Sequence, residues 1–203
     1  MTHTSTNILL DKLDAFIRKY YLNQLLKGSI FFTGIFVLSF LLVTLLEYYG
    51  RYTSQVRAIL FYSVCTVALF CLVKYILIPL SHLFKLGKQI DHKQAALIIG
   101  KHFSGVSDKL LNTLQLMQAG NGDEALLLAA IDQKTNELKP VPFTLAIDFK
   151  KNIKYLRYAL FPVLTLLVIL IVSPGMISDG AKRVIKYNQT FKVPAPFIFQ
   201  IEN

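Results

Sequence analysis

The sequence predicts an all-α integral membrane protein. It would have three transmembrane helices, an N-terminal amphipathic helix, a small cytoplasmic helical module, and a C-terminal strand that starts an extracytoplasmic β domain. Hydrophobic residues make up 54% of the 203 residues, and the mean hydropathy is +0.48. Three segments without a charged residue, 28–46, 58–73 and 158–178, contain 19, 16 and 21 residues. About 20 apolar helical residues cross a bilayer, so these segments favour membrane spans over a very apolar soluble helical protein.

The first predicted element is an N-terminal amphipathic helix in residues 1–27. Its apolar residues recur at helical spacing and share one face: Leu9, Leu13, Phe16, Ile17 and Tyr20. The charged side chains of this segment lie mostly on other faces. Two interpretations stay open, a helix that lies on the inner leaflet and a helix that docks on a partner.

Residues 28–80 are predicted to form a transmembrane hairpin. The second span runs through Lys74 to Leu80, because a lysine near a helix end can extend its ammonium to the interface. Gly34 follows small residues at positions 29 and 33 and predicts a close helix approach. Glu47, at the end of the first span, is interpreted as an interfacial carboxylate paired with Arg51 at i+4, with an ion ligand as the less favoured alternative.

Residues 81–154 are predicted to form a cytoplasmic module of three short helices. Asp91 and Gln94 resemble a capping box before the first helix, and Ser107 is the expected cap of the second. The second helix carries a hydrophobic face, interpreted as internal packing or, less favoured, as a partner interface: Leu110, Leu111, Leu114 and Met117. The third helix opens near Glu124 and ends before Pro140. Residues 143–149 then alternate between apolar and polar, which is typical of a strand or of an extended segment on the membrane surface.

Residues 155–175 are predicted to be the third transmembrane helix, which 173–175 (SPG) ends. Residues 176–203 would be extracytoplasmic, with a short basic helix at 181–187 and a strand at 191–201. A single strand cannot satisfy its own backbone. We therefore expect an extracytoplasmic β domain to continue from this strand.

Basic residues crowd against the predicted spans and give the chain a net charge of +10. We expect those nearest the first and third spans to contact lipid headgroups rather than nucleic acid: Arg18, Lys19, Lys27, Lys150, Lys151, Lys154 and Arg157. The same bias predicts an inner, N-terminal side, because Lys and Arg near span ends are twice as frequent there as on the other side. The lipid bilayer is thus one expected partner.

No residue pattern for catalysis, a cofactor or a metal ion is recognised. His102, Ser104 and Asp108 are crowded into seven residues across a turn, which argues against a catalytic triad. The histidines lack the spacing of metal ligands. Cys65 and Cys71 lie within the second span without a CxxC spacing, so we interpret them as buried, inert thiols.

Several stretches of the chain resemble one family: FIRKYYLNQLLKG at 16–28, LEYYG at 46–50, AALIIGKHF at 95–103, VSDKLLNTLQL at 106–116 and PAPF at 194–197. They are similar to the N-terminal region of large, uncharacterised inner-membrane proteins of Bacteroidota-type bacteria, catalogued as a domain of unknown function. The resemblance implies a membrane anchor that carries a long periplasmic region, rich in strands and then helices. It implies no catalytic residue.

The predicted function is therefore a non-enzymatic inner-membrane anchor or scaffold. It would link the cytoplasmic module to an envelope-facing region, with the N-terminus cytoplasmic and the C-terminus periplasmic. Expected protein partners are further copies of the chain or other envelope membrane proteins. The alternative is a subunit of a transporter or secretion machine, in which Glu47 or Lys74 lines a path. A membrane enzyme would need a polar cavity that the sequence does not indicate.

Overall fold

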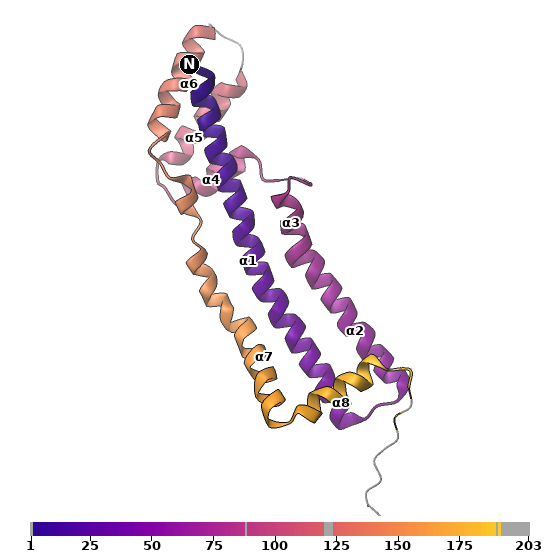
Figure 1. Ribbon diagram of the computed structural model, residues 1–203. Coiled ribbons are helices and arrows are strands. Elements are labelled where there is room, and N and C mark those ends of the chain that lie inside the picture. Colours follow the sequence, from indigo (N-terminus) through magenta and orange to yellow (C-terminus); the bar gives the residue numbers. More distant parts are fainter. Residues whose placement is uncertain (1, 88, 120–123, 190, 192–203) are drawn as a thin grey trace, which may run out of the picture. The chain divides into compact units, whose positions relative to one another are not determined.

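The computed structural model describes residues 2–87, 89–119, 124–189 and 191, and the regular elements in these ranges are helical (Figure 1). Three helical stretches are long and apolar enough to cross a membrane: Asn7–Gly50, Ser54–Leu83 and Phe143–Val172. The all-α class and the three spans are thus confirmed by length and composition. The predicted strand at 191–201 lies outside the described residues except for Phe191, so the structure gives no support to a β domain.

The chain divides into two compact units. Unit 1 contains Met1–Ser29 and Val73–Tyr155, and unit 2 contains Ile30–Leu72 and Leu156–Asn203. Helix α1 (Thr2–Gly50) contributes to both units as one uninterrupted helix of 49 residues. The amphipathic segment and the first span are therefore parts of one helix, without a break at residues 27 and 28.

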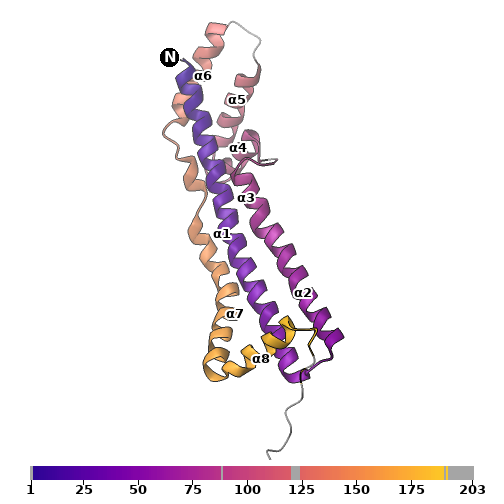
Figure 2. The same cartoon turned by 45° about the vertical axis from the view of Figure 1, so that its right-hand side comes forward.

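Unit 1 is a helical module built around the N-terminal part of α1. Its other elements are η1 (Val73–Leu77), α3 (Ile78–Leu83), α4 (His92–Gly100), α5 (Val106–Ala119), α6 (Glu124–Leu138), η2 (Phe143–Ala146) and η3 (Phe149–Asn152). Figures 1 and 2 both show α4, α5 and α6 gathered beside the start of α1. The apolar face of α1 forms the core of unit 1 with residues from these helices: Leu9, Leu13, Phe16, Ile17, Tyr21, Ala95, Ala96, Ile99, Leu110, Leu114, Leu138, Phe143 and Ile147. The predicted face exists, but this chain covers it instead of the leaflet or a partner.

The α4–α5 hairpin is held at close range by a glycine. A Cβ atom on Gly100 would lie 2.3 Å from the Cβ of Ser107, so a larger residue would push α5 away. The predicted capping box at α4 is confirmed, and the backbone N–H of Asp91 donates to Oε1 of Gln94 (3.4 Å). Ser107 is not the N-cap of α5, because α5 begins at Val106. Its hydroxymethyl group packs against α4 instead.

The strand predicted at 143–149 is wrong, since two 3₁₀ turns, η2 and η3, occupy this segment. No partner strand lies among the described residues, so the backbone is satisfied locally. Leu145 N–H donates to the carbonyl of Pro142 (2.9 Å), and the side chain of Asp148 accepts from Lys150 N–H (2.9 Å). Phe143 and Ile147 are buried in the core of unit 1. The segment is therefore packed on unit 1 through Phe143 and Ile147, whereas Leu145 and Phe149 stay exposed.

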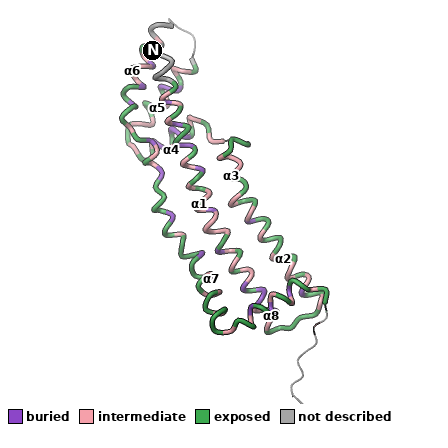
Figure 3. The backbone as a smooth tube through the Cα atoms, viewed as in Figure 1, coloured by how far each residue is buried: buried purple, intermediate pink, exposed green. Residues whose placement is uncertain are grey.

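Unit 2 contains the rest of α1, α2 (Ser54–Leu72), most of α7 (Ile153–Val172) and α8 (Pro174–Ile185). Helix α7 ends at Val172, as the following Ser-Pro-Gly predicts. Helix α8 starts earlier than the predicted 181–187 helix and buries Ile177, Gly180 and Val184. Figure 3 shows α2 and α7 exposed along most of their length. Most of their exposed side chains are apolar, for example Phe161 at 73% and Ile171 at 81% exposure, which suits contact with lipid.

Two glycines of α1 pack closely against the carbonyl oxygen of a residue that lies four positions before a proline. Tyr75 precedes Pro79 in this way, and a Cβ on Gly28 would lie 2.1 Å from the carbonyl oxygen of Tyr75, within unit 1. In unit 2, Pro162 stands in the same relation to Tyr158, whose carbonyl oxygen would lie 2.5 Å from a Cβ on Gly34. The close approach predicted at Gly34 is confirmed.

Candidate functional site

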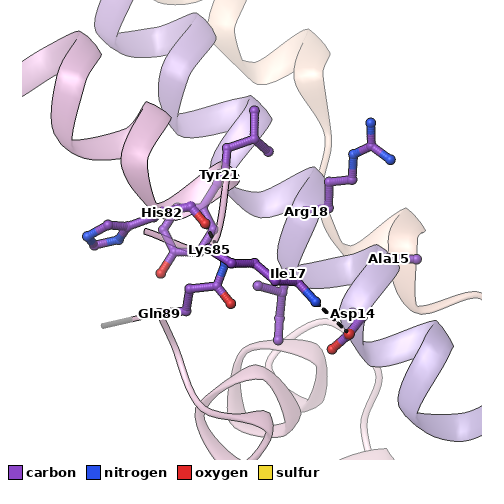
Figure 4. A pocket seen from close by; sticks show the side chains of 9 residues that line it. Asp14, Ala15, Ile17, Arg18, Tyr21, His82, Lys85 and Gln89 are labelled. Carbon is purple, nitrogen blue, oxygen red and sulfur yellow. Dashed lines mark hydrogen bonds and ion pairs between the residues drawn. The ribbon is translucent and has the colours of Figure 1, made fainter. Parts of the chain in front are cut away.

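Unit 1 contains a cleft of about 300 Å³ with polar groups in its lining, between α1 and the segment that follows α3 (Figure 4). Helix α1 contributes one wall and residues 82–89 contribute the other. The lining residues that carry polar groups are Asp14, Arg18, Tyr21, His82, Lys85 and Gln89.

The chain reverses after α3 through two residues with left-handed backbone angles. Lys85 has φ +60° and Gly87 has φ +124°, and Leu86 N–H closes the turn on the carbonyl of Ser81 (2.8 Å). A left-handed lysine costs about 1–2 kcal/mol. In this conformation Lys85 forms an ion pair, in which its Nζ lies 3.5 Å from Oδ2 of Asp14.

Asp14 joins two segments of unit 1 to α1. Its Oδ2 faces Lys85, and its Oδ1 lies 2.9 Å from Nε2 of His92, the first residue of α4. The side chain of Asp14 is 49% exposed, so each pair is worth at most about 1 kcal/mol. Because both oxygens of Asp14 have basic neighbours, this carboxylate connects the α3–α4 segment to α1.

The remaining wall of the cleft is fixed by Tyr21. Its hydroxyl oxygen accepts a hydrogen bond from the backbone N–H of Ile90 (2.9 Å), and its ring meets the ring of His82 edge to face at 5.0 Å. The side-chain amide of Gln89 donates to the carbonyl of His82. In Figure 4 the guanidinium of Arg18 points away from the Asp14–Lys85 pair. The cleft thus has the basic groups of Arg18 and Lys85 in its lining, which suits an anionic or carbonyl-bearing ligand.

Metal chemistry is not indicated at this cleft or elsewhere in the part of the chain that the structure describes. These residues contain no group of three or more His, Cys, Asp or Glu side chains placed to hold a metal ion. Cys71 is buried, whereas Cys65 is exposed on α2, contrary to the predicted burial of both thiols.

The predicted hydrophobic face of α5 is occupied within unit 1. Leu110 and Leu114 are buried in the core, and Leu111 and Met117 are half-buried and packed against it. This face is therefore part of the module's interior and is not available as a large partner surface.

The basic residues predicted on α1 have different surroundings. Arg18 lines the cleft, and the ammonium of Lys19 donates to the carbonyl of Thr144 (2.8 Å). The ammonium of Lys27 lies 4.6 Å from the centre of the Tyr155 ring. The Lys19 side chain thus attaches η2 to α1. Lys27 directly precedes the first uncharged segment.

The basic residues predicted before the third span lie on η3 and α7. Lys150 and Lys151 are exposed on η3, and the ammonium of Lys154 lies 4.9 Å from the centre of the Tyr155 ring. In unit 2, Arg157 lies over the ring of Tyr158 at 5.1 Å. Their contact with lipid headgroups stays a prediction.

A second polar site, in unit 2, was predicted with the wrong partner. Glu47 is fully buried and its Oε1 lies 3.8 Å from Nε of Arg57 on α2, which is 5% exposed. Arg51 is not its partner, because α1 ends at Gly50 and Arg51 turns away with φ +43°. Arg57 donates to the carbonyls of Tyr52 and Gln189, each at 3.1 Å. Neither carboxylate oxygen of Glu47 accepts a hydrogen bond from the described residues.

Sequence reasoning missed both of these arrangements. Asp14, Lys85 and His92 are far apart in the chain, and no local spacing relates them. For Arg57, its position among uncharged residues at the start of a span was a usable signal, because charged residues there are usually paired. Comparison of the chain with protein-family models, with curated proteins and with solved structures found no match.

Proposed function

We propose that the chain is a non-enzymatic membrane anchor or scaffold. It would link a helical module on the cytoplasmic side of a bacterial inner membrane to an envelope-facing region. The observation that carries this proposal is the continuity of α1. The helix supplies Leu13 and Phe16 to the core of unit 1 and runs on unbroken as an apolar helix into unit 2. A helix that is both a module's core and a membrane span ties the module firmly to the bilayer.

The cleft beside Asp14 is the contact that we propose for a partner of this module. The hydrophobic face of α5 is filled internally, whereas Lys85 is 75% exposed and Arg18, in the cleft lining, is exposed. Arginine and lysine at a preformed polar wall suit carboxylate or carbonyl groups of a second chain. A further copy of this protein or another membrane protein could supply them.

The proposed orientation rests on charge. Lys and Arg close to span ends are more numerous on the side of the N-terminus than on the other side, and cytoplasmic loops carry such an excess. On the N-terminal side they are Lys12, Arg18, Lys19, Lys27, Lys74, Lys85, Lys88, Lys93, Lys139, Lys150, Lys151, Lys154 and Arg157. On the other side they are Arg51, Arg57, Lys182, Arg183, Lys186 and Lys192.

The anchor proposal is tested by cross-linking in membranes and extraction of the tagged full chain in a mild detergent. We expect a second chain or a second copy at near-stoichiometric amount. Arg18→Glu should reduce it, and Lys101→Glu, which changes an exposed lysine of unit 1 outside the cleft, should not. A chain that migrates as a bare monomer without any cross-linked neighbour would contradict the scaffold proposal. Equal loss in both variants would contradict the role of the cleft.

A transporter or secretion subunit is the second candidate, and the buried Glu47–Arg57 pair favours it. Buried ionisable residues in membrane spans commonly mark ion or proton paths, and this pair lies near the ends of two spans. Under this alternative, Glu47→Gln together with Lys74→Gln should abolish flux in vesicles that contain the complete complex. Unchanged flux would remove the candidate and leave the anchor proposal intact.

A further inference from the structure

Two lysines from different segments of unit 1 converge on one tyrosine ring. The ammonium of Lys27, on α1, lies 4.6 Å from the centre of the Tyr155 ring, and that of Lys154, on α7, lies 4.9 Å from it. Both contacts are within cation–π range. The phenol thus has two positive charges beside it, one from each of two helices that lead into apolar spans.

The position along the chain places this cluster at the edge of the hydrocarbon. Lys27 immediately precedes the 19 uncharged residues of 28–46, and Tyr155 stands just before the 21 uncharged residues of 158–178. Lysine and tyrosine are both favoured at the membrane–water boundary, where their apolar parts stay in the bilayer and their polar ends reach the headgroups. The group most abundant at this depth is the phosphate of a phospholipid.

The convergence is built into unit 1. Asn152, 4% exposed, donates from its side-chain amide to Oδ1 of Asn23 (2.6 Å), one turn before Lys27. This bond holds the end of η3, and with it the first turn of α7, against α1. Lys19 adds a second attachment through the carbonyl of Thr144. These polar contacts hold the two segments that carry the lysines next to each other within unit 1.

We propose that Lys27, Lys154 and the hydroxyl of Tyr155 form a binding site for the phosphate of an anionic phospholipid headgroup. The two ammonium groups and the phenol O–H are hydrogen-bond donors on neighbouring side chains, and a phosphodiester offers two oxygens that share one negative charge to receive them. The exposed Lys150 and Lys151 on η3 add positive charge next to the site. This inference rests on the proposed function in one respect, that the apolar helices lie in a bilayer.

The site predicts a preference for anionic lipid that depends on two residues. The full chain, purified in a neutral detergent, is titrated with dioleoylphosphatidylglycerol or with dioleoylphosphatidylcholine. The lipid-bound fraction is then measured by native mass spectrometry. Each lysine near an anionic headgroup contributes about fivefold to binding, so Lys27→Gln with Lys154→Gln should weaken phosphatidylglycerol binding about 25-fold. Binding of phosphatidylcholine should change little.

Three controls show whether a loss of phosphatidylglycerol binding comes from the lipid site, from the general loss of positive charge, from misfolding or from a site for free phosphate. Lys101→Gln with Lys134→Gln removes the same charge from unit 1 away from the apolar boundary and should leave the phosphatidylglycerol affinity within twofold. Lys27→Arg with Lys154→Arg, which keeps both charges, should retain the affinity and shows that the fold tolerates substitution. Inorganic phosphate at millimolar concentration should compete no better than chloride at equal ionic strength, since the site requires the lipid's depth.

The outcomes that would overturn the site differ from those that would overturn the anchor. Equal affinity of the Lys27/Lys154 glutamine variant and the Lys101/Lys134 variant would refute it, as would effective competition by inorganic phosphate. If the Lys27/Lys154 glutamine variant lost a cross-linked neighbour while its lipid binding stayed normal, the ligand would be an acidic group of a partner and the lipid assignment would be wrong. A full chain that binds phosphatidylglycerol but has no cross-linked neighbour would leave this site standing and remove the scaffold.

Discussion

The buried pair of Glu47 and Arg57 gives the sharpest prediction about stability. Replacing Arg57 by methionine keeps an unbranched side chain but removes the charge and the two hydrogen bonds to the carbonyls of Tyr52 and Gln189. Glu47 would then be fully buried without its nearest countercharge, and the weaker attraction of Arg183 would remain. Breaking a buried ion pair from one side costs about 3–5 kcal/mol.

Replacing Glu47 instead of Arg57 should lower the stability less. In Glu47→Gln the guanidinium keeps both of its carbonyl acceptors, and the neutral amide needs no countercharge. In Glu47→Gln with Arg57→Met no charge remains, and such replacements are often close to neutral. We therefore expect the double variant to be more stable than Arg57→Met alone, although it carries one more substitution.

Thermal unfolding of the full chain in dodecyl maltoside, followed by far-ultraviolet circular dichroism, measures the effect. For a chain of this size, about 2–4 °C in Tm corresponds to 1 kcal/mol, so Arg57→Met should lower Tm by about 6–20 °C. Arg51→Met, at the exposed residue after α1, is the matched control and should change Tm by less than about 2 °C. If Arg57→Met melted like Arg51→Met, or if the double variant lost the sum of the two single effects, the ion-pair reasoning would be refuted.

Three further predictions concern packing and topology. Phe16→Ala should destabilise unit 1 by about 3–5 kcal/mol because Phe16 is fully buried. Amide hydrogen exchange should become faster than in the unsubstituted protein in unit 1 and less so in unit 2. An equal change in both units would contradict this prediction. Gly34→Leu should cost about 1–3 kcal/mol by overpacking against the carbonyl of Tyr158, visible as a lower Tm, and Gly175→Leu is the control because no close neighbour surrounds Gly175. With the native cysteines replaced, Asn7→Cys and Gln189→Cys should react with an impermeant maleimide from opposite faces of intact vesicles, and labelling of both from one face would exclude an odd number of spans.

Local patterns predicted the helical class, the spans and the N-terminal amphipathic face, because each depends on the order of apolar and polar residues within a few helical turns. The capping box of Asp91 and Gln94 was predictable for the same reason, since its two residues are three apart. Gly34 was predicted as a contact point from its small neighbours. Its partner was not, because the carbonyl that it meets belongs to a turn more than 120 residues away, four positions before Pro162.

Tertiary structure decided what covers each face and which charges meet. Residues 143–149 alternate like a strand, but a strand needs a neighbour to receive its backbone bonds, and here the segment folds into 3₁₀ turns on the core of unit 1. Arg51 has the helical spacing to pair with Glu47, yet the helix stops at Gly50, and a residue of the next helix takes its place. Hydropathy and capping act between residues close in sequence and can be read along the chain. The pairing of Asp14 with Lys85 and His92, and of Lys27 with Lys154 around one phenol, requires separate segments to be brought together by packing.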